Sequence, residues 1–107
     1  MVRLGISLYG SYPSLEVSRE INLKSALELK TKVSNVKTIK AGTSVSYACT
    51  FTATKDMKIA TLPVGYADGF PRTQKNPQVF INGRLLNIVG RICMDQCMVE
   101  IPDDFDV

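Results

Sequence analysis

The sequence of 107 residues contains no histidine, and this absence excludes several common kinds of chemistry. A Ser-His-Asp triad and a Cys-His pair both require an imidazole, so most hydrolase mechanisms are disfavoured. The three cysteines form no CxxC pair, and without histidine they do not match the ligand spacing of a zinc site. The chain also lacks a GxGxxG motif and a Walker A glycine loop. We therefore expect no metal site.

Cysteine is scarce, and the few thiols do not form an even disulfide set. Reduced thiols in a cytosolic protein are the simplest interpretation of Cys49, Cys93 and Cys97. Cys93 and Cys97 would share one face of a strand, so a two-thiolate site is the alternative to buried, small apolar side chains.

Long hydrophobic runs are absent as well. No apolar run approaches the roughly 20 residues that span a bilayer. The first residues, MVRLGISLYG, lack the long hydrophobic region of a signal peptide. We expect a soluble, cytoplasmic chain with no membrane partner.

The composition that remains is that of an ordinary globular domain, with 45% hydrophobic and 21% charged residues. The length suffices for one small domain, or part of one. Thirteen basic and ten acidic residues give a net charge of +3, which does not by itself indicate nucleic acid as a partner.

Alternating hydrophobicity dominates the first half of the chain. Residues 1–14 predict a short buried strand that leads into a loop, with Arg3 as a solvated charge at the strand end. Residues 23–40 predict a long strand with one solvent-exposed face, because leucines fall on odd positions and lysines on even ones over 23–33. The lysines then form a solvated stripe, and a phosphate-binding stripe is the alternative. Residues 45–54 predict a half-buried strand, and 58–64 the second strand of a hairpin with it.

Turn residues organise the second half. Pro63 places the end of a strand at an edge or bulge, and Asp68-Gly69 is a turn dipeptide. Asn82-Gly83 between apolar stretches predicts a type I′ hairpin. The returning strand would continue from 84 to 101, with a bulge or bend at Gly90. The fold class that we predict is all-β, with five to seven antiparallel strands in a small barrel or sandwich.

Tyrosine is the residue type with the best claim to chemistry once histidine is missing. Tyr47 lies in the alternating strand, and Tyr66 lies just beyond the strand that follows it. A free tyrosine has a pKa near 10, so it acts as a base at neutral pH only where nearby cations favour the phenolate. The alternative is that both rings pack in a core with a hydrogen-bonded hydroxyl.

Five segments, taken in order, resemble segments of alanine racemase: RLGISLYG, LKSALELKTKVSNVK, VSYACTFTA, ATLPVGYADGF and VGRICMDQCMV. YADG and GRICMDQ together make the resemblance specific. That family pairs an N-terminal (β/α)₈ barrel with a C-terminal antiparallel β-domain. The resemblance implies that residues 1–14 are the last strand and exit of the barrel domain. Residues 15–107 would be a partial β-domain, incomplete at its C-terminal end.

The resemblance also implies a function. The family interconverts L-alanine and D-alanine with pyridoxal 5′-phosphate and two bases, which supplies D-alanine for peptidoglycan. Tyr47 matches the catalytic tyrosine, which acts on one face of the substrate α-carbon. The lysine that acts on the opposite face and carries the cofactor lies outside this sequence, so we expect the chain alone to be inactive. Ala48 stands where the family most often has glycine.

Further matches concern binding. Arg3 matches the arginine that hydrogen-bonds the cofactor's pyridine nitrogen, and Gly5 and Ile6 match backbone amides near its phosphate. Met94 and Asp95 match residues that line the substrate carboxylate side.

Tyr66 matches a tyrosine at the active-site entrance. The resemblance further implies a homodimer whose active sites are shared between subunits.

Two alternatives remain open. One is a serine racemase of the same family. The other is a non-catalytic β-barrel module that binds an anionic partner through its lysines, whose affinity would fall steeply with salt. Those lysines are Lys24, Lys30, Lys32, Lys37 and Lys40.

Overall fold

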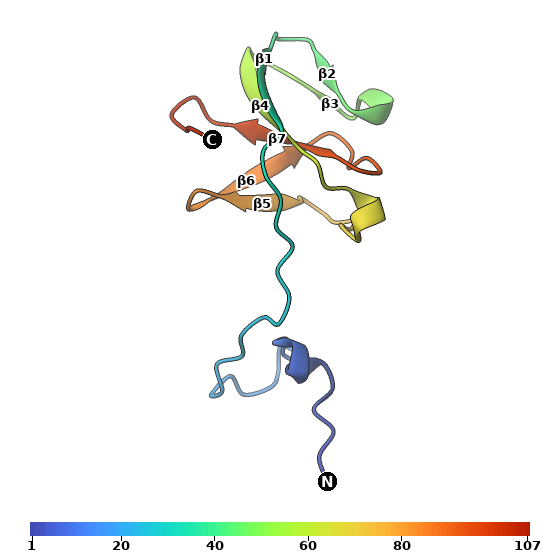
Figure 1. Ribbon diagram of the computed structural model, residues 1–107, viewed down its shortest axis with the longest axis vertical. Coiled ribbons are helices and arrows are strands. Elements are labelled where there is room, and N and C mark those ends of the chain that lie inside the picture. Colours follow the sequence, from blue (N-terminus) through green and yellow to red (C-terminus); the bar gives the residue numbers. More distant parts are fainter. The chain divides into compact units, whose positions relative to one another are not determined.

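A computed structural model describes all residues of the chain, 1–107 (Figure 1). The chain divides into two compact units, Met1–Lys30 and Thr31–Val107. The three helices, η1 (Gly5–Tyr9), η2 (Tyr47–Cys49) and η3 (Tyr66–Asp68), are single short 3₁₀ segments. None of them has the length and hydrophobicity that a membrane-spanning helix needs.

The second unit contains every strand, and its main element is an antiparallel five-stranded sheet of order β1-β4-β7-β6-β5 (Figure 1). Its strands are β1 (Asn35–Ile39), β4 (Met57–Leu62), β5 (Gln78–Ile81), β6 (Arg84–Val89) and β7 (Cys97–Ile101). A second, two-stranded sheet pairs β2 (Ser44–Val45) with β3 (Phe51–Thr52). The prediction of an antiparallel all-β fold is confirmed. The sheet is open, with β1 and β5 at its edges, so the strands do not close into a barrel.

The core lies on both faces of the sheet, because side chains alternate between the faces of each central strand. On β4, Ala60 and Leu62 belong to one hydrophobic cluster, whereas Met57 and Ile59 belong to the other. On β7, Val99 belongs to the first cluster. No polar or charged residue is buried, so the sheet is held by apolar packing and by its backbone ladder.

The predicted strand over 45–54 is wrong. The chain turns back at η2, and the short strands on either side, β2 and β3, pair with each other. The predicted hairpin between 45–54 and 58–64 is wrong for the same reason, since β4 pairs with β1 and β7. The strand prediction for 58–64 itself is confirmed by β4.

The predicted long strand over 23–40 is confirmed only in its second part, as β1, and is wrong over 23–33, because regular pairing begins at Asn35. Ser34 N–H donates to the Thr61 carbonyl at 2.9 Å and marks the start of the ladder. A period-two pattern makes a strand only where a neighbour supplies hydrogen bonds, and residues 23–33 have no such neighbour.

The first unit contains no strand, and none of its residues is buried. The predicted buried strand in residues 1–14 is therefore wrong, since η1 occupies Gly5–Tyr9 and no partner strand is present. Gly10 ends η1 with a left-handed conformation, and its N–H donates to the carbonyl oxygens of Ile6 and Ser7. The Ala26 N–H donates to the Tyr9 carbonyl at 3.1 Å and holds the following loop against the helix.

Turn chemistry in the second half follows the sequence closely. Asn82 and Gly83 have φ of 43° and 87° and join β5 to β6, which confirms the predicted type I′ hairpin. Gly90, with φ of 73°, bends the chain so sharply that the predicted strand over 84–101 becomes the two antiparallel strands β6 and β7.

Candidate functional site

Three connections of the second unit meet at one end of the sheet: η2, η3 and residues 90–96, which we call the site loop (Figure 1). The site loop joins β6 to β7 and is the shared support. The Tyr66 N–H donates to the Cys93 carbonyl at 3.0 Å, and the Ala67 N–H donates to the Met94 carbonyl at 2.9 Å. These two bonds hold η3 on the site loop.

The residue that precedes Tyr66 allows this close approach. A Cβ atom built on Gly65 would collide with the carbonyl oxygens of Cys93 and Met94. The Gly65 N–H also donates to the Asp68 carboxylate at 2.9 Å, which closes the turn. The predicted Asp68-Gly69 turn is confirmed, since η3 ends at Gly69 with φ of 88°.

The Tyr66 side chain extends from this turn and is 40% exposed. The Arg72 guanidinium lies 5.5 Å from the centroid of its ring. A cation over an aromatic face at this distance is attracted to it, so Arg72 restrains the ring.

Tyr47 lies at the tip of a tight turn. Ser46, Ala48 and Cys49 have φ of 66°, 60° and 48°, so the backbone turns within three residues. The Tyr47 ring is 68% exposed and does not pack in the core. Ala48 has φ of 60°, a conformation that glycine adopts without steric cost and alanine does not.

A hydrogen bond ties the Tyr47 turn to the site loop. The Ser46 hydroxyl donates to the Arg91 carbonyl at 2.6 Å, and it lies 3.5 Å from the Cys93 sulfur. Gly90 makes room for this contact, because a Cβ there would lie 2.6 Å from the Val45 carbonyl oxygen.

Met94 and Asp95 lie at the tip of the site loop, and both are exposed. The Cys93 N–H donates to the Gln96 carbonyl at 2.9 Å and closes the loop below them. The Met94 N–H makes no hydrogen bond within the chain and is available to a ligand. The structure thus places Tyr47, Tyr66, Met94 and Asp95 on segments that share one support.

The thiols beneath the site loop are packed in the core. Cys93 and Cys97 are buried, each in one of the two hydrophobic clusters, whereas Cys49 is exposed. Burial, together with the charge that Cys93 carries when ionised, raises the pKa of the Cys97 thiol to about 11. A thiol with such a pKa stays neutral at pH 7, which favours the packing interpretation over a two-thiolate site.

The other predicted site residues belong to the first unit. Arg3 is exposed just before η1, and Gly5 and Ile6 form its first turn. The N–H groups of Gly5 and Ile6 donate no hydrogen bond within the chain. Gly5 has φ of 53°, and a Cβ there would meet nothing within 4 Å, so the space beside it is open.

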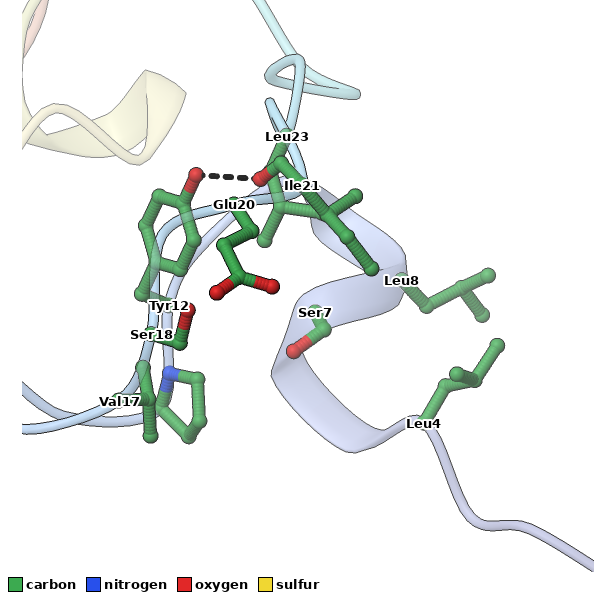
Figure 2. Close-up of a pocket in the computed structure, with 10 residues that line it drawn as sticks. Leu4, Ser7, Leu8, Tyr12, Val17, Ser18, Glu20, Ile21 and Leu23 are labelled. Carbon is green, nitrogen blue, oxygen red and sulfur yellow. Dashed lines mark hydrogen bonds between the residues drawn. The ribbon is translucent and has the colours of Figure 1, made fainter.

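A pocket of about 590 Å³ lies beside η1 (Figure 2). Leu4, just before η1, and Leu8, within it, border the pocket on one side. Tyr12, whose hydroxyl donates to the Ile21 carbonyl at 2.6 Å, borders it from the loop. The lining is mainly apolar and contains Glu20 but no cation. The pocket therefore does not coincide with the predicted phosphate amides, and the sequence patterns gave no indication of it.

Sequence reasoning also missed Ser46, Gly65 and Gly90 as supports of the site. Their importance depends on contacts with segments that are distant in sequence. The two glycines that precede Tyr66 and Arg91 were the only local indication.

The comparisons with known proteins agree with one another. The family model described as "Alanine racemase, C-terminal domain" matches residues 26–107. The alanine racemase of Methanococcus maripaludis is 54% identical over 94% of this chain and 27% of its own length. The alanine racemase of Staphylococcus carnosus is 49% identical over 100% of this chain and 28% of its own length.

Solved structures give the same result. The alanine racemase of Clostridium difficile 630 in complex with cycloserine matches 94% of this chain with a TM-score of 0.88 and 48% identity. The alanine racemase of Bacillus anthracis with bound L-Ala-P matches 95% with a TM-score of 0.85 and 38% identity. The chain covers 27% of each of these two solved chains. Both the family match and the shared fold lead to one conclusion: the chain belongs to the family of the alanine racemase C-terminal domain.

Proposed function

We propose that this chain is the C-terminal part of an alanine racemase, which interconverts L-alanine and D-alanine and supplies D-alanine for peptidoglycan. Family membership supports the proposal. The observation that carries it is the exposed Tyr47 ring on a turn tied to the loop that bears Met94 and Asp95. A tyrosine whose role was core packing would be buried, and this one is not.

Racemisation needs a proton removed from one face of the α-carbon and a proton returned to the other. In the proposal, the Tyr47 hydroxyl exchanges the proton on one face. A lysine outside these residues acts on the opposite face. A chain without that lysine lacks one of the two bases, so we expect the 107 residues alone to have no racemase activity.

The residues of the first unit fit pyridoxal phosphate. The unpartnered N–H groups of Gly5 and Ile6, beside open space, suit a phosphate. Arg3 is exposed, and a guanidinium offers only N–H donors, so it suits a hydrogen bond to the pyridine nitrogen and disfavours protonation there. When bound, pyridoxal phosphate supplies an electron sink for the negative charge that develops at the α-carbon.

The site loop suits the substrate carboxylate. The free N–H of Met94 is a donor that a carboxylate accepts from, and Asp95 lines the same side. Tyr66, held from one side by Arg72, controls access to this region in the proposal.

The proposal includes a homodimer in which Arg3, Gly5 and Ile6 serve one active site and the residues around the site loop serve its twin. It also keeps residues 1–14 as part of the barrel domain. A cytoplasmic location belongs to the proposal, and three free cysteines support a reducing compartment.

The test uses the full-length enzyme, in which this chain is joined to the remainder of the protein, with Tyr47→Phe. Exchange of the α-proton into solvent is timed separately from L-alanine and from D-alanine. We expect exchange to collapse for one enantiomer, L-alanine, and to persist for D-alanine through the lysine. Tyr66→Phe is the control, because it removes a hydroxyl from the same region without removing a base.

Near-normal exchange from both enantiomers in Tyr47→Phe would contradict the proposed role of Tyr47. The same selective loss of exchange from L-alanine in Tyr47→Phe and in Tyr66→Phe would contradict it as well. Only the removal of a base should affect one enantiomer and spare the other.

A further inference from the structure

Ser46 has an unusual backbone conformation. Its φ of 66° and ψ of −174° lie in a region that is essentially restricted to glycine. A residue with a Cβ atom stays there only where its surroundings hold it. Ser46 immediately precedes Tyr47, so its backbone dihedrals set the direction in which the Tyr47 turn leaves β2.

The surroundings that hold Ser46 come from the site loop. The Ser46 hydroxyl donates to the Arg91 carbonyl at 2.6 Å, across a separation of 45 residues. Gly90 packs directly beneath this contact, since a Cβ there would lie 2.8 Å from the Ser46 Cβ. The same hydroxyl lies 3.5 Å from the Cys93 sulfur, so the Ser46 side chain links the turn that bears Tyr47 to the loop that bears Met94 and Asp95.

We infer that Ser46 is a positioning residue: its hydroxyl bond to the Arg91 carbonyl holds the Tyr47 turn in register with the site loop, so that the phenol reaches the α-carbon of a substrate held by that loop. This inference rests on the proposed function. Ser46 itself need touch neither substrate nor cofactor for this role.

Loss of the Ser46 hydroxyl should change the backbone at Tyr47, because Ser46 has a strained, positive φ. Without the bond, Ser46 relaxes toward negative φ, and the peptide that enters Tyr47 rotates with it. A displacement of about 1 Å at a reacting group costs up to about 100-fold in rate. The site loop, which receives the substrate carboxylate, keeps its own hydrogen bonds to η3. We therefore expect kcat to fall while KM changes little.

The experiment compares Ser46→Ala with Ser44→Ala in the full-length enzyme with pyridoxal phosphate bound. Ser44 is the matched control, because its hydroxyl contacts Thr52 at 3.1 Å within the same hairpin and does not reach the site loop. We expect Ser46→Ala to lower α-proton exchange from L-alanine about 10- to 100-fold, with exchange from D-alanine retained. Ser44→Ala should change neither exchange rate.

A second variant separates the hydroxyl from the backbone strain and remains useful if Ser46→Ala does not fold. Glycine adopts the Ser46 conformation at no steric cost but supplies no hydroxyl. Ser46→Gly should therefore show exchange from L-alanine between that of the wild type and that of Ser46→Ala. Full wild-type exchange in Ser46→Gly would overturn the inference, because the hydroxyl bond would then be unnecessary.

Equal loss of exchange from both enantiomers in Ser46→Ala would also overturn the inference, since it indicates general damage to the site. Exchange rates in Ser46→Ala that match those in Ser44→Ala would overturn it too. These failures differ from failure of the proposed function. A wild-type enzyme that does not racemise alanine refutes the function. A racemase whose Tyr47→Phe variant loses exchange selectively, but whose Ser46→Ala variant does not, refutes only the role of Ser46.

Discussion

Gly65 packs against the Cys93 carbonyl so closely that no side chain fits between them, and the N–H of the next residue, Tyr66, donates to that same oxygen at 3.0 Å. The backbone of η3 thus lies directly on the backbone of the site loop. Gly65 has an ordinary extended conformation, with φ of −148°. Glycine is therefore required here by the close packing against the site loop, and not by an unusual backbone conformation.

Gly65→Ala should destabilise the chain by about 3 kcal/mol, because the added Cβ meets rigid backbone on the site loop. Urea unfolding of the 107-residue chain measures this difference in the free energy of unfolding. Gly42→Ala is the control. Gly42 has φ of 85°, and a Cβ there would have no atom within 4 Å, so strain alone should cost about 1 kcal/mol. A loss at Gly65 no larger than that at Gly42 would contradict the steric argument.

The elements that were predicted correctly from the sequence are determined by residues that are close together in the chain. Asn82-Gly83 forms its hairpin because both positions adopt positive φ, which is a local requirement. The strand at 58–64 was predictable because β4 pairs with a strand on each side and buries apolar residues on both faces.

The parts that it did not predict depend on distant contacts. Hydrophobic alternation continues unbroken through Tyr47, yet the chain turns there, held by a hydrogen bond to Arg91 at a separation of 45 residues. Residues 23–33 alternate in the same manner but have no strand beside them. Periodicity describes which side chains would share a face, and it does not reveal whether a partner strand is present.

The site residues were predicted by resemblance, and the structure explains only some of their placement. Tyr47, Tyr66 and Met94 belong to segments that contact a single loop. Arg3 and Gly5 belong to the first unit, so no contact within the second unit bears on them.

Ala48→Gly should stabilise the chain, because Ala48 has φ of 60° and ψ of 13°, where a Cβ costs about 1 kcal/mol. The greater freedom of glycine in the unfolded chain offsets part of this, so we expect a net gain of about 0.5 kcal/mol. Urea unfolding measures it. Ala41→Gly is the control, since Ala41 has no positive φ and should lose stability on the same change. A loss at both positions would contradict strain at Ala48.

Asp56 links two connections of the sheet. Its carboxylate accepts hydrogen bonds from the Lys40 ammonium at 2.7 Å and from the Ala41 N–H at 3.0 Å, and together they lower its pKa. A lowered folded pKa means that the stabilisation is present above the unfolded value and is lost as pH falls through the folded value. Asp56→Asn should therefore be less stable than wild type at pH 7, and the difference should vanish near pH 2.

The measurement is urea unfolding of both proteins across that pH range. Asp103→Asn is the control, because its only ion pair, with Lys55, spans 3.9 Å between exposed groups and should contribute little. A difference between wild type and Asp56→Asn that is independent of pH would show that the carboxylate charge is not responsible.

The three cysteines should differ in reactivity with a thiol reagent at pH 8. Cys49 is exposed and should be labelled quickly, whereas Cys93 and Cys97 are buried and should react only when the chain unfolds. Counting labelled thiols against time by mass spectrometry tests this. Rapid labelling of all three in the absence of urea would contradict the packing of the site loop on the core.

Burial of Cys97 also predicts a pH dependence at the alkaline end. Its pKa is raised from 9.0 to about 11, so the neutral thiol is favoured in the folded chain. The resulting stabilisation is fully present below pH 9 and is lost as pH rises toward 11. Cys97→Val keeps an apolar group of similar size but cannot ionise. Wild type should therefore lose more stability than Cys97→Val between pH 8 and pH 10.5, and parallel losses would show that the thiol is not desolvated.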